Sequence, residues 1–402
     1  MFNLEKFIYE YVVKRPISMF QLDIERNIDI LRTKIENKTV LVVGGAGSIG
    51  SSFIKAVLPF KPKSLVVVDV NENGLAELTR DLRSTNGMYV PEKYITYPMD
   101  FASEVFEKMF RDSKGFDVVA NFSAHKHVRS EKDIYSVEAL LKNNVLHVKK
   151  LLDLLTEYPP EEYFCVSTDK AANPVNIMGA SKRLMEDVIF SYSDKFPVKT
   201  ARFANVAFSN GSLPDGFLKR IAKLQPLSAP SDVKRYFVSP EESGQICMLA
   251  CMLGNNREIF FPKLEEAQMM TFDAIATRLL EVQGYEVLEC GSDEEAIDKS
   301  ELLKQGSNQY PVHYAKSDTS GEKAYEEFFT EEESVDIVRF SSLGVVTSKE
   351  LYDSNKVEQL FNDLNTEFDS KEVNKEKIVK IIKTFLPNFE HIETGKSLDS
   401  KM

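Results

Sequence analysis

The sequence predicts an α/β fold with a doubly wound parallel sheet, a smaller C-terminal lobe and helical extensions. Between residues 39 and 203, short apolar runs such as VLVV and SLVVVDV alternate with segments of helical periodicity. Strands that are apolar throughout belong to parallel sheets whose two faces are both covered by helices. The first run ends in the glycine-rich stretch GGAGSIG, just before a predicted helix. Doubly wound folds bind ligands at this position.

These elements divide the chain into four expected parts. Residues 1–36 have helical spacing with a break at Arg15-Pro16, and form an N-terminal extension. The alternating pattern predicts a Rossmann domain at residues 37–205. Residues 206–346, where the alternation loosens, form a smaller substrate lobe with a polar surface insertion near residues 291–311. Residues 347–402 contain the amphipathic stretch KEKIVKIIKTFL and are expected to form a helical extension, with an oligomer contact as the alternative.

The composition limits the partners and the compartment. The 402 residues carry a net charge of −12, which argues against a nucleic-acid surface. The four cysteines have no metal-ligand spacing, and Cys247 and Cys251 lie one helical turn apart in an apolar run, as core thiols in a reducing compartment do. We find no signal peptide and no apolar run near the ~18 residues of a membrane helix. We therefore expect a cytoplasmic protein without a membrane span.

The glycine-rich stretch and the strand that follows it predict a dinucleotide site. Gly44 to Gly50 has the spacing G-x-x-G-x-x-G. Glycines let the backbone approach a pyrophosphate, and the helix N-terminus offers it unpaired N–H groups. Asp69 ends the next strand, where a carboxylate accepts hydrogen bonds from ribose hydroxyls and repels a 2′-phosphate, so NAD is favoured over NADP. Asp100 and Phe101 would flank the adenine, although an acid that caps the next helix looks the same.

Five motifs in order carry a family resemblance: NFSAHKHV, FCVSTDKAANPVNIMGASK, RFANVAFSNGS, KRYFVSPEE and SGEKAYEEFF. Together they resemble the UDP-N-acetylglucosamine 4,6-dehydratases, the polysaccharide-biosynthesis (capsular) branch of the extended short-chain dehydrogenase/reductase superfamily, over roughly residues 37–345. Members with Met in place of the catalytic Tyr are often preceded by membrane helices and a short Arg-x-Pro segment. Arg15-Pro16 resembles that segment, and the chain resembles a soluble version of these proteins.

The resemblance implies a reaction and a catalytic set. NAD-dependent dehydration would convert a UDP-N-acetylhexosamine (UDP-GlcNAc) to the 4-keto-6-deoxy sugar, for bacterial surface glycans or amino sugars. Asp169 would protonate the leaving hydroxyl and Lys170 would remove the carbon-5 proton, so the pocket must raise the proton affinity of the acid and lower that of the base. Met-bearing members resemble retaining dehydratases, so carbon 5 should keep its configuration. The implied catalytic residues are Thr168, Asp169, Lys170, Met178 and Lys182.

Met178 leaves the first step of this reaction open, because a thioether cannot take a proton from the carbon-4 hydroxyl. Asp169, acting first as base and later as acid, is the favoured candidate. Lys182 and a water held by Thr168 are the others. For the whole protein, the alternatives are a carbon-5-inverting dehydratase, a nucleotide-sugar 4-epimerase and a module that binds NAD without turnover.

The resemblance also implies binding contacts. The cofactor contacts are Gly44, Gly47, Ser48, Ile49, Gly50, Asp69, Asn71, Asn73, Asp100, Phe101, Phe122, Ala124, Lys126, Asn144 and Lys182. The substrate contacts are Lys126, His127, Asn205, Arg235 and Glu322, with a solvated surface arginine as the alternative for Arg235.

Three further expectations complete the analysis. His125 and His127 lie two apart in a loop with no third ligand, so we expect no metal. Asn143 and Asn144 interrupt a helical pattern, and one of them should bend the helix or hydrogen-bond near the active loop. The relatives associate through long helices that flank the sheet, so a homo-oligomer is expected.

Overall fold

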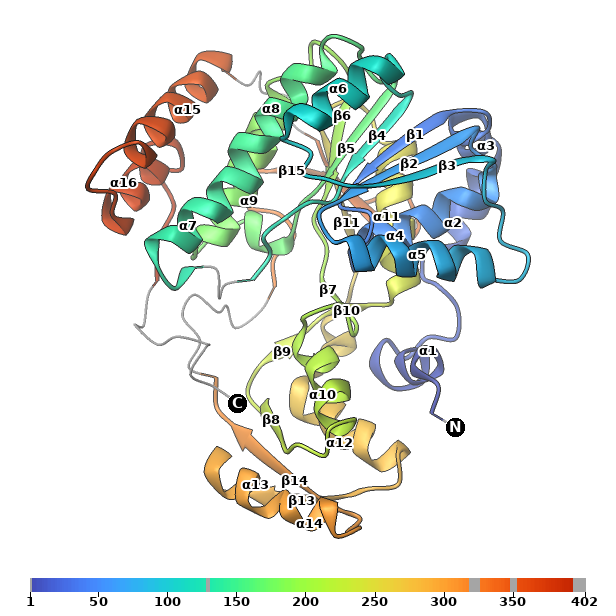
Figure 1. Cartoon of the computed structure of the whole chain (residues 1–402), viewed down its shortest axis with the longest axis vertical. Coiled ribbons are helices and arrows are strands. Elements are labelled where there is room, and N and C mark those ends of the chain that lie inside the picture. The colour runs from blue at the N-terminus through green and yellow to red at the C-terminus, as the bar shows by residue number, and fades with distance from the viewer. Residues whose placement is uncertain (1, 128–130, 318–325, 348–352, 393–402) are drawn as a thin grey trace.

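The computed structural model describes residues 2–127, 131–317, 326–347 and 353–392. Its centre is a nine-stranded sheet with the order β15-β16-β11-β6-β5-β4-β1-β2-β3 (Figure 1). The seven strands from β3 to β11 are parallel, and β16 and β15 continue the sheet in antiparallel pairing. The strands are β1 Thr39–Val43, β2 Ser64–Asp69, β3 Lys93–Pro98, β4 Val118–Asn121, β5 Glu162–Val166, β6 Val198–Ala201, β11 Glu258–Pro262, β15 Ser334–Asp336 and β16 Leu343–Thr347.

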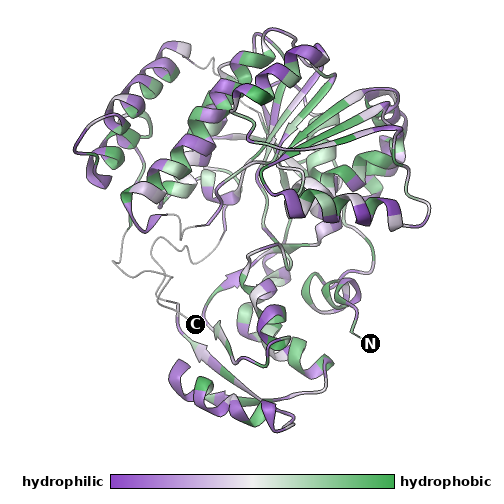
Figure 2. Cartoon of the chain, viewed as in Figure 1, coloured by the Kyte–Doolittle hydropathy of each residue, from purple (hydrophilic) through white to green (hydrophobic). Residues whose placement is uncertain are grey.

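Helices cover both faces of this sheet, so the predicted doubly wound fold is confirmed. Val40 and Val42 of β1 pack into one core with α4, α5 and α11, whereas Leu41 and Val43 pack into a second core with α6 to α9. The strands appear mostly hydrophobic in Figure 2, as buried parallel strands should. The helices are α4 Ser48–Val57, α5 Glu72–Ser84, α6 Glu104–Ser113, α7 Ile134–Leu141, α8 His147–Leu155, α9 Ile177–Phe190 and α11 Pro240–Leu253, with a short 3-10 turn at Leu58–Phe60.

A smaller lobe lies below the carboxyl ends of these strands (Figure 1). Its three-stranded parallel sheet has the order β13-β14-β8, and two short ladders, β7 with β10 and β9 with β12, connect it to the main body. The elements are β7 Asn205–Val206, α10 Leu213–Ile221, β8 Leu227–Pro230, β9 Lys234–Arg235, β10 Phe237–Val238, a 3-10 turn at Glu266–Gln268, β12 Met270–Thr271, α12 Phe272–Val282, β13 Glu286–Cys290, α13 Asp293–Lys299, α14 Glu301–Lys304 and β14 Gln309–Ala315.

Two expectations about residues 206–346 need correction. The chain returns from the lobe to the main sheet as β11, β15 and β16, so these residues contribute to both bodies. Residues 291–311 are also more than a surface insertion. They lead through α13 and α14 into β14, the central strand of the lobe, where Tyr310 is fully buried. The polar residues of this stretch lie on its outer face. The composition alone therefore predicted a surface insertion and gave no sign of the buried face.

The N-terminal extension packs against both bodies. It contains α1 Leu4–Phe7, a π-helix at Ile8–Val12, α2 Gln21–Arg26 and α3 Ile28–Ile35, and the chain is non-helical at Arg15-Pro16 as predicted. Phe7 lies in the core of the small lobe, whereas Leu31 lies in the core under the main sheet. Between them, the guanidinium of Arg15 donates to both carboxylate oxygens of the fully buried Glu242, each at 2.7 Å.

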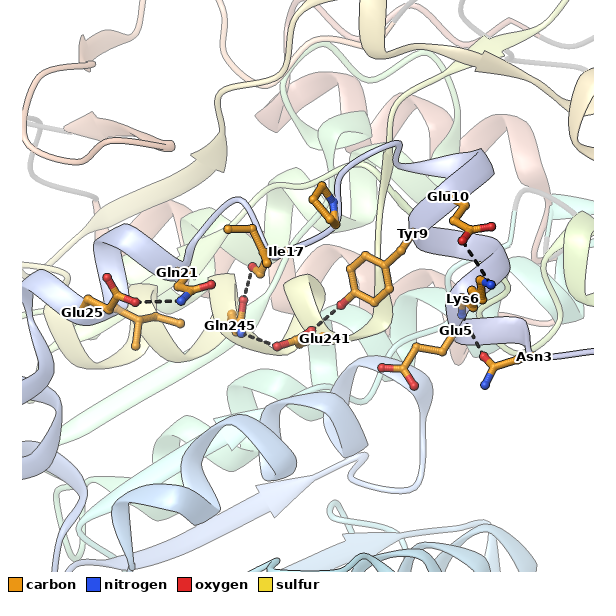
Figure 3. A pocket seen from close by; sticks show the side chains of 13 residues that line it. Asn3, Glu5, Lys6, Tyr9, Glu10, Ile17, Gln21, Glu25, Glu241 and Gln245 are labelled. Atoms are coloured by element: carbon orange, nitrogen blue, oxygen red, sulfur yellow. Dashed lines mark hydrogen bonds and ion pairs between the residues drawn. The ribbon is translucent and has the colours of Figure 1, made fainter.

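A cavity of about 780 Å³ lies between this extension and the start of α11. Figure 3 shows Tyr9 of the extension donating a hydrogen bond to Glu241, which also accepts one from Gln245. The lining of this cavity contains none of the residues predicted to bind cofactor or substrate.

The C-terminal extension forms a helical hairpin of α15 Ser354–Phe368 and α16 Lys375–Phe385, packed beside α7 to α9 (Figure 1). Within the described residues, none of the helices combines the length and the apolar character needed to cross a membrane. The four cysteines are buried free thiols, and Cys247 and Cys251 are core residues as predicted.

Candidate active site

The glycine-rich loop forms a close-packed cradle between β1 and α4. Gly44 has φ of +73°, and a Cβ at this position would lie 2.5 Å from the backbone nitrogen of Ser123. A Cβ on Gly50 would lie 2.4 Å from the carbonyl oxygen of Gly44. Gly47 is the N-cap of α4. The loop therefore presents bare backbone and the first amides of a helix, the arrangement that accommodates a pyrophosphate.

A cavity of about 490 Å³ opens beside this loop, at the carboxyl ends of β1, β2 and β4. This is the position where the strand order of the sheet reverses, between β1 and β4. Seven of the predicted cofactor residues line the cavity: Gly44, Gly47, Asp69, Asp100, Phe101, Phe122 and Ala124. The lining also includes Asn143, one of the two asparagines that interrupt the helical pattern, and His147, which the sequence did not indicate as a contact.

Asp69 lies at the edge of the cavity and its carboxylate is fixed by the backbone. One oxygen accepts a hydrogen bond from the amide of Ala46 at 3.0 Å, and the other accepts one from Asn71 at 2.9 Å. Asp69 therefore holds the glycine-rich loop against the end of β2, in the place expected for a ribose-binding acid.

Several predicted cofactor residues do not line the cavity, and two of them make structural hydrogen bonds. Asn71 caps α5 by accepting from the amide of Gly74 at 3.0 Å, and Asn73 is exposed on that helix. Asn144 is fully buried in a π-helical turn at Lys142–Leu146, where its amide bonds His125 at N and O, both at 2.9 Å, and Ser181 at 3.0 Å. The expected irregularity at the two asparagines is confirmed, but Asn144 positions the loop after β4 rather than facing the cavity.

The predicted acid–base pair lies directly beyond β5. Asp169 begins a 3-10 turn at Asp169–Ala171, and its side chain is 5% exposed. The hydroxyl of Thr168 donates to Asp169 Oδ1 at 2.6 Å, and the ammonium of Lys170 lies 3.2 and 3.1 Å from the two carboxylate oxygens. The carboxylate thus accepts hydrogen bonds from two neighbours.

The proton affinity of Lys170 differs from the expectation. Burial lowers the pKa of Lys170, but the negative charges of Asp169 and Glu326 outweigh burial and raise it above its usual value. The expected lowering was therefore wrong for the free site, because the charge of the adjacent Asp169, together with that of Glu326, outweighs burial.

Lys182 lies on α9 and reaches the same strand end. Lys182 is 4% exposed, its ammonium donates to the carbonyl of Val166 at 3.0 Å, and burial lowers its pKa. Met178 is 3% exposed, one turn before Lys182, as the i, i+4 spacing predicted.

Glu326 is a member of the site that the sequence analysis missed. It is 9% exposed and accepts hydrogen bonds from the side chain of Asn205 at 2.6 Å and from the amide of Tyr236 at 2.8 Å. Burial and the charge of Asp169 raise the pKa of Glu326 to about 7. Arg235 is 6% exposed and its charge acts on both Lys170 and Glu326, so it is a buried site residue rather than a solvated surface arginine.

Comparison with known proteins identifies the family. The family described as "Polysaccharide biosynthesis protein" matches residues 40–348. The chain belongs to this family. It is 31% identical over 355 residues to the "Uncharacterized membrane protein MJ1061" of Methanocaldococcus jannaschii, a match that covers 87% of this chain and 96% of that protein.

Two further relatives of this chain are named for a role. The "Probable polysaccharide biosynthesis protein EpsC" of Bacillus subtilis is 31% identical, with 63% of this chain and 42% of EpsC covered, so the chain spans less than half of that relative. A "UDP-N-acetylglucosamine 4,6-dehydratase (inverting)" of Campylobacter jejuni is 26% identical, with 56% and 67% covered. The family and the sheet topology assign the protein to the polysaccharide-biosynthesis branch of the extended short-chain dehydrogenases, as the motifs predicted.

Solved structures share the fold of this chain. Pen from Bacillus thuringiensis superposes with a TM-score of 0.63 at 21% identity, and 84% of this chain and 99% of Pen are covered. DesIV, a dTDP-glucose 4,6-dehydratase from Streptomyces venezuelae, gives a TM-score of 0.53 at 20% identity, with 72% and 87% covered.

Two of the remaining predicted residues follow β4, and another begins α4. Lys126 and His127 follow β4, and His127 lies against Gly211, whose Cβ would be 3.2 Å from His127 Nε2. Ser48 accepts a hydrogen bond from the amide of Asn210 at 2.9 Å, which links the cofactor loop to the segment before α10. Glu322 lies outside the described residues. The described residues contain no cluster of three or more His, Cys, Asp or Glu side chains suited to a metal ion.

We expect Gly44→Ala to destabilise the protein well beyond a simple backbone effect. An alanine at positive φ costs about 1–2 kcal/mol, and the new Cβ would also press against the backbone at Ser123. Such overpacking adds about 1–3 kcal/mol. Gly87→Ala is the matched control, because Gly87 has φ of +75° with nothing within 4 Å. Chemical denaturation should show the larger loss for Gly44→Ala, and equal losses would contradict the close packing described above.

Proposed function

We propose that this protein is an NAD-dependent 4,6-dehydratase that converts a UDP-N-acetylhexosamine, UDP-GlcNAc, to its 4-keto-6-deoxy derivative with retention at carbon 5. The observation that carries the proposal is the contact between Asp169 and Lys170, at 3.1 Å, at the end of β5. A 4-epimerase needs no acid and base for elimination, whereas a dehydratase needs both. The pair therefore favours dehydration.

The cradle and cavity fit NAD. The bare backbone at Gly44 and Gly47 and the amides of α4 suit the pyrophosphate, and Asp69 suits the ribose hydroxyls. When bound, NAD would accept the hydride from carbon 4 of the sugar and return it to carbon 6. DesIV, which shares the fold, was solved with NAD bound.

Asp169 serves twice in the proposed proton transfers. As a carboxylate held by Thr168 and Lys170, it takes the proton of the carbon-4 hydroxyl as the alcohol is oxidised to the ketone. It then gives this proton to the carbon-6 hydroxyl, which leaves as water. One carboxyl thus supplies both the base that Met178 cannot provide and the acid that the elimination needs.

Lys170 must lose a proton before it can remove the acidified proton at carbon 5. In the free site, Asp169 and Glu326 together hold that proton on Lys170. Neutralisation of Asp169 in the first step removes one of these charges and so lowers the pKa of Lys170. Glu326, with a pKa of about 7, is the neighbouring group suited to accept the released proton. Lys170 returns its proton to the same face of carbon 5, which gives retention.

The substrate diphosphate would meet Lys126, Asn205 and Arg235 at the mouth of the site. Arg235 is the strongest candidate, since guanidinium groups bind phosphate oxygens in pairs. A cytoplasmic location and a homo-oligomer remain predictions. The hairpin of α15 and α16 already covers the outer side of α8, so an oligomer would have to include this hairpin or use another face.

Incubation of the protein with NAD and UDP-GlcNAc in heavy water, followed by NMR, tests the proposal. We expect a 4-keto-6-deoxy product with solvent deuterium at carbon 5 and unchanged configuration there, without accumulation of reduced nicotinamide. Inversion at carbon 5 would indicate an inverting dehydratase. UDP-GalNAc as product would indicate a 4-epimerase. No turnover of UDP- or GDP-linked hexosamines would indicate a binding module.

We expect Glu326 to make the protein less stable as the pH rises. Its pKa is about 7 in the folded protein against 4.5 for a free glutamate, so the folded state binds the proton more tightly. This contribution is complete below about pH 4.5 and is lost as the pH rises through about 7. The wild-type midpoint of denaturation should fall relative to that of Glu326→Gln across this window. Glutamine can replace the carboxyl, because Asn205 can turn its amide to meet it. Parallel pH profiles would contradict the raised pKa.

A further inference from the structure

A buried glutamate outside the acid–base pair binds the first turn of α9, the helix that carries Met178 and Lys182. Glu131 is 8% exposed, and its Oε1 accepts a hydrogen bond from the backbone amide of Met178 at 2.9 Å. The next amide, that of Gly179, is capped by Asn176 within the helix at 2.7 Å. One first-turn amide of α9 is therefore held by a carboxylate from a separate segment, where the helix dipole favours negative charge.

The C-terminal extension holds this glutamate from the other side. Lys375, the first residue of α16, donates to the carbonyl of Glu131 at 2.9 Å, and His391 Nε2 lies 3.5 Å from Glu131 Oε2. The amide of Ile392 donates to the carbonyl of Val175, three residues before Met178, at 3.0 Å. Residues at both ends of the segment 375–392 thus contact either Glu131 or the residues just before α9.

The hairpin that carries this segment is firmly packed. Leu364, Ile378 and Ile382 are fully buried in the core shared with α8 and α9, and Phe389 is 2% exposed. Lys149 of α8 also pairs with Glu358 of α15 at 3.1 Å. The contacts to Glu131 and Val175 are therefore made by a rigid element of the protein.

The start of α9 is mechanically coupled to the acid–base pair. A Cβ on Gly179 would lie 2.6 Å from the carbonyl oxygen of Lys170, so the helix and the catalytic turn are in close contact. Lys182 lies one turn further along α9. A shift of the first turn of α9 would therefore move both lysines of the site.

We propose that residues 375–392 are a positioning element of the active site, which acts through Glu131 on the first turn of α9. The proposal rests on the proposed dehydratase function for its kinetic effect, although the contact itself does not depend on it. Glu131 makes no hydrogen bond or ion pair with Asp169 or Lys170, so it is a positioning residue. The C-terminal extension thereby contributes to the position of the candidate active-site residues on α9.

Four variants of the full chain test the proposal. Glu131→Ala removes the acceptor for Met178, Glu131→Gln keeps an acceptor but removes the charge near His391, and His391→Ala removes the contact from the C-terminal segment. Glu358→Gln is the matched control, because it breaks an ion pair of the same hairpin at α8, away from the approach to α9. The readouts are hydrogen exchange of residues 177–182 and the kinetics with UDP-GlcNAc.

We expect Glu131→Ala to speed the exchange of these amides roughly tenfold or more, because their local opening becomes easier. Its kcat should fall roughly tenfold to a hundredfold with little change in KM, since small misplacements of catalytic groups have effects of this size. Glu131→Gln should retain most of the exchange protection and most of kcat. His391→Ala should change both quantities less than Glu131→Ala does, and Glu358→Gln should change neither.

Unchanged exchange in Glu131→Ala, or equal effects in Glu358→Gln, would overturn the proposal. Unchanged exchange in His391→Ala would overturn the role of the C-terminal segment. If the wild-type protein turns over no nucleotide sugar, the proposed function fails, and the exchange measurements, made without substrate, still decide this inference.

Discussion

Asp169→Asn is expected to lower the rate of dehydration by roughly 10²–10⁴-fold, the range that general acid–base catalysis contributes. Asparagine has nearly the size of aspartate and can still accept a hydrogen bond from Thr168, so the fold and the turn at Asp169–Ala171 should persist. The amide can neither take the proton from the carbon-4 hydroxyl nor deliver one to the leaving hydroxyl. The rate of product formation, followed by NMR, measures the loss.

The same variant separates the two roles assigned to Asp169. If Asp169 is the first base, Asp169→Asn forms neither product nor the 4-keto intermediate. Reduced nicotinamide that accumulates with UDP-GlcNAc would show that oxidation proceeds and only elimination has stopped, which would leave Asp169 as the acid alone. Asp81→Asn is the control, since Asp81 is 42% exposed and pairs with Lys55 on the surface. It should retain full activity.

The local parts of this site could be predicted from the sequence because short-range patterns determine them. The glycine spacing from Gly44 to Gly50 and the adjacent Asp169 and Lys170 depend on one strand end and the residues after it. The irregular helix at Asn143 and Asn144 was also visible, since two residues that weaken helices interrupt a helical pattern. Each of these features lies within one βα unit of the fold.

Features that depend on distant pairing could not be predicted in this way. The strand β16 pairs with β11, which lies about 80 residues earlier in the chain. Part of the small lobe is formed by the residues between these two strands, so no local pattern indicates that they pair. Glu326 lies in a charged stretch that resembles a solvent-exposed turn, whereas in the fold it is buried and accepts hydrogen bonds from the distant Asn205 and Tyr236. The pKa of Lys170 is raised mainly by the adjacent Asp169 and further by this glutamate, so only the second of these contributions was hidden from the sequence.

Arg202→Met is expected to destabilise the protein by about 3–5 kcal/mol, the cost of removing one partner from a buried ion pair. Arg202 follows β6 and is fully buried. It donates to both oxygens of Glu186 on α9, at 2.9 and 2.6 Å, and to both oxygens of Glu333, at 2.9 and 2.8 Å. Methionine fills similar space but leaves the carboxylate of Glu186, which is 1% exposed, without its guanidinium.

The pH dependence of this loss has a definite sign. Burial raises the pKa of Glu333, but its hydrogen bond to Arg202 and the charge of Arg202 lower that pKa by more. The net pKa of Glu333 is therefore below its usual value. Such a carboxylate stabilises the protein above its unfolded pKa, and this contribution is lost on acidification through the folded pKa. In Arg202→Met, the lowered pKa disappears, and the deficit in stability should therefore be largest near neutral pH and shrink in acid.

A double variant distinguishes lost pairing from lost packing. In Arg202→Met/Glu186→Met no buried carboxylate remains on α9 at this position, and apolar replacement of a whole buried pair is often neutral or stabilising. Denaturation should therefore show that the double variant is more stable than Arg202→Met alone. Arg32→Met is the surface control, since Arg32 is 58% exposed and lies 3.4 Å from the exposed Asp29; its cost should be at most about 1 kcal/mol. A double variant as unstable as the sum of its two single variants would show that Arg202 stabilises the end of β6 by packing, and that charge pairing between the sheet and the catalytic helix contributes little.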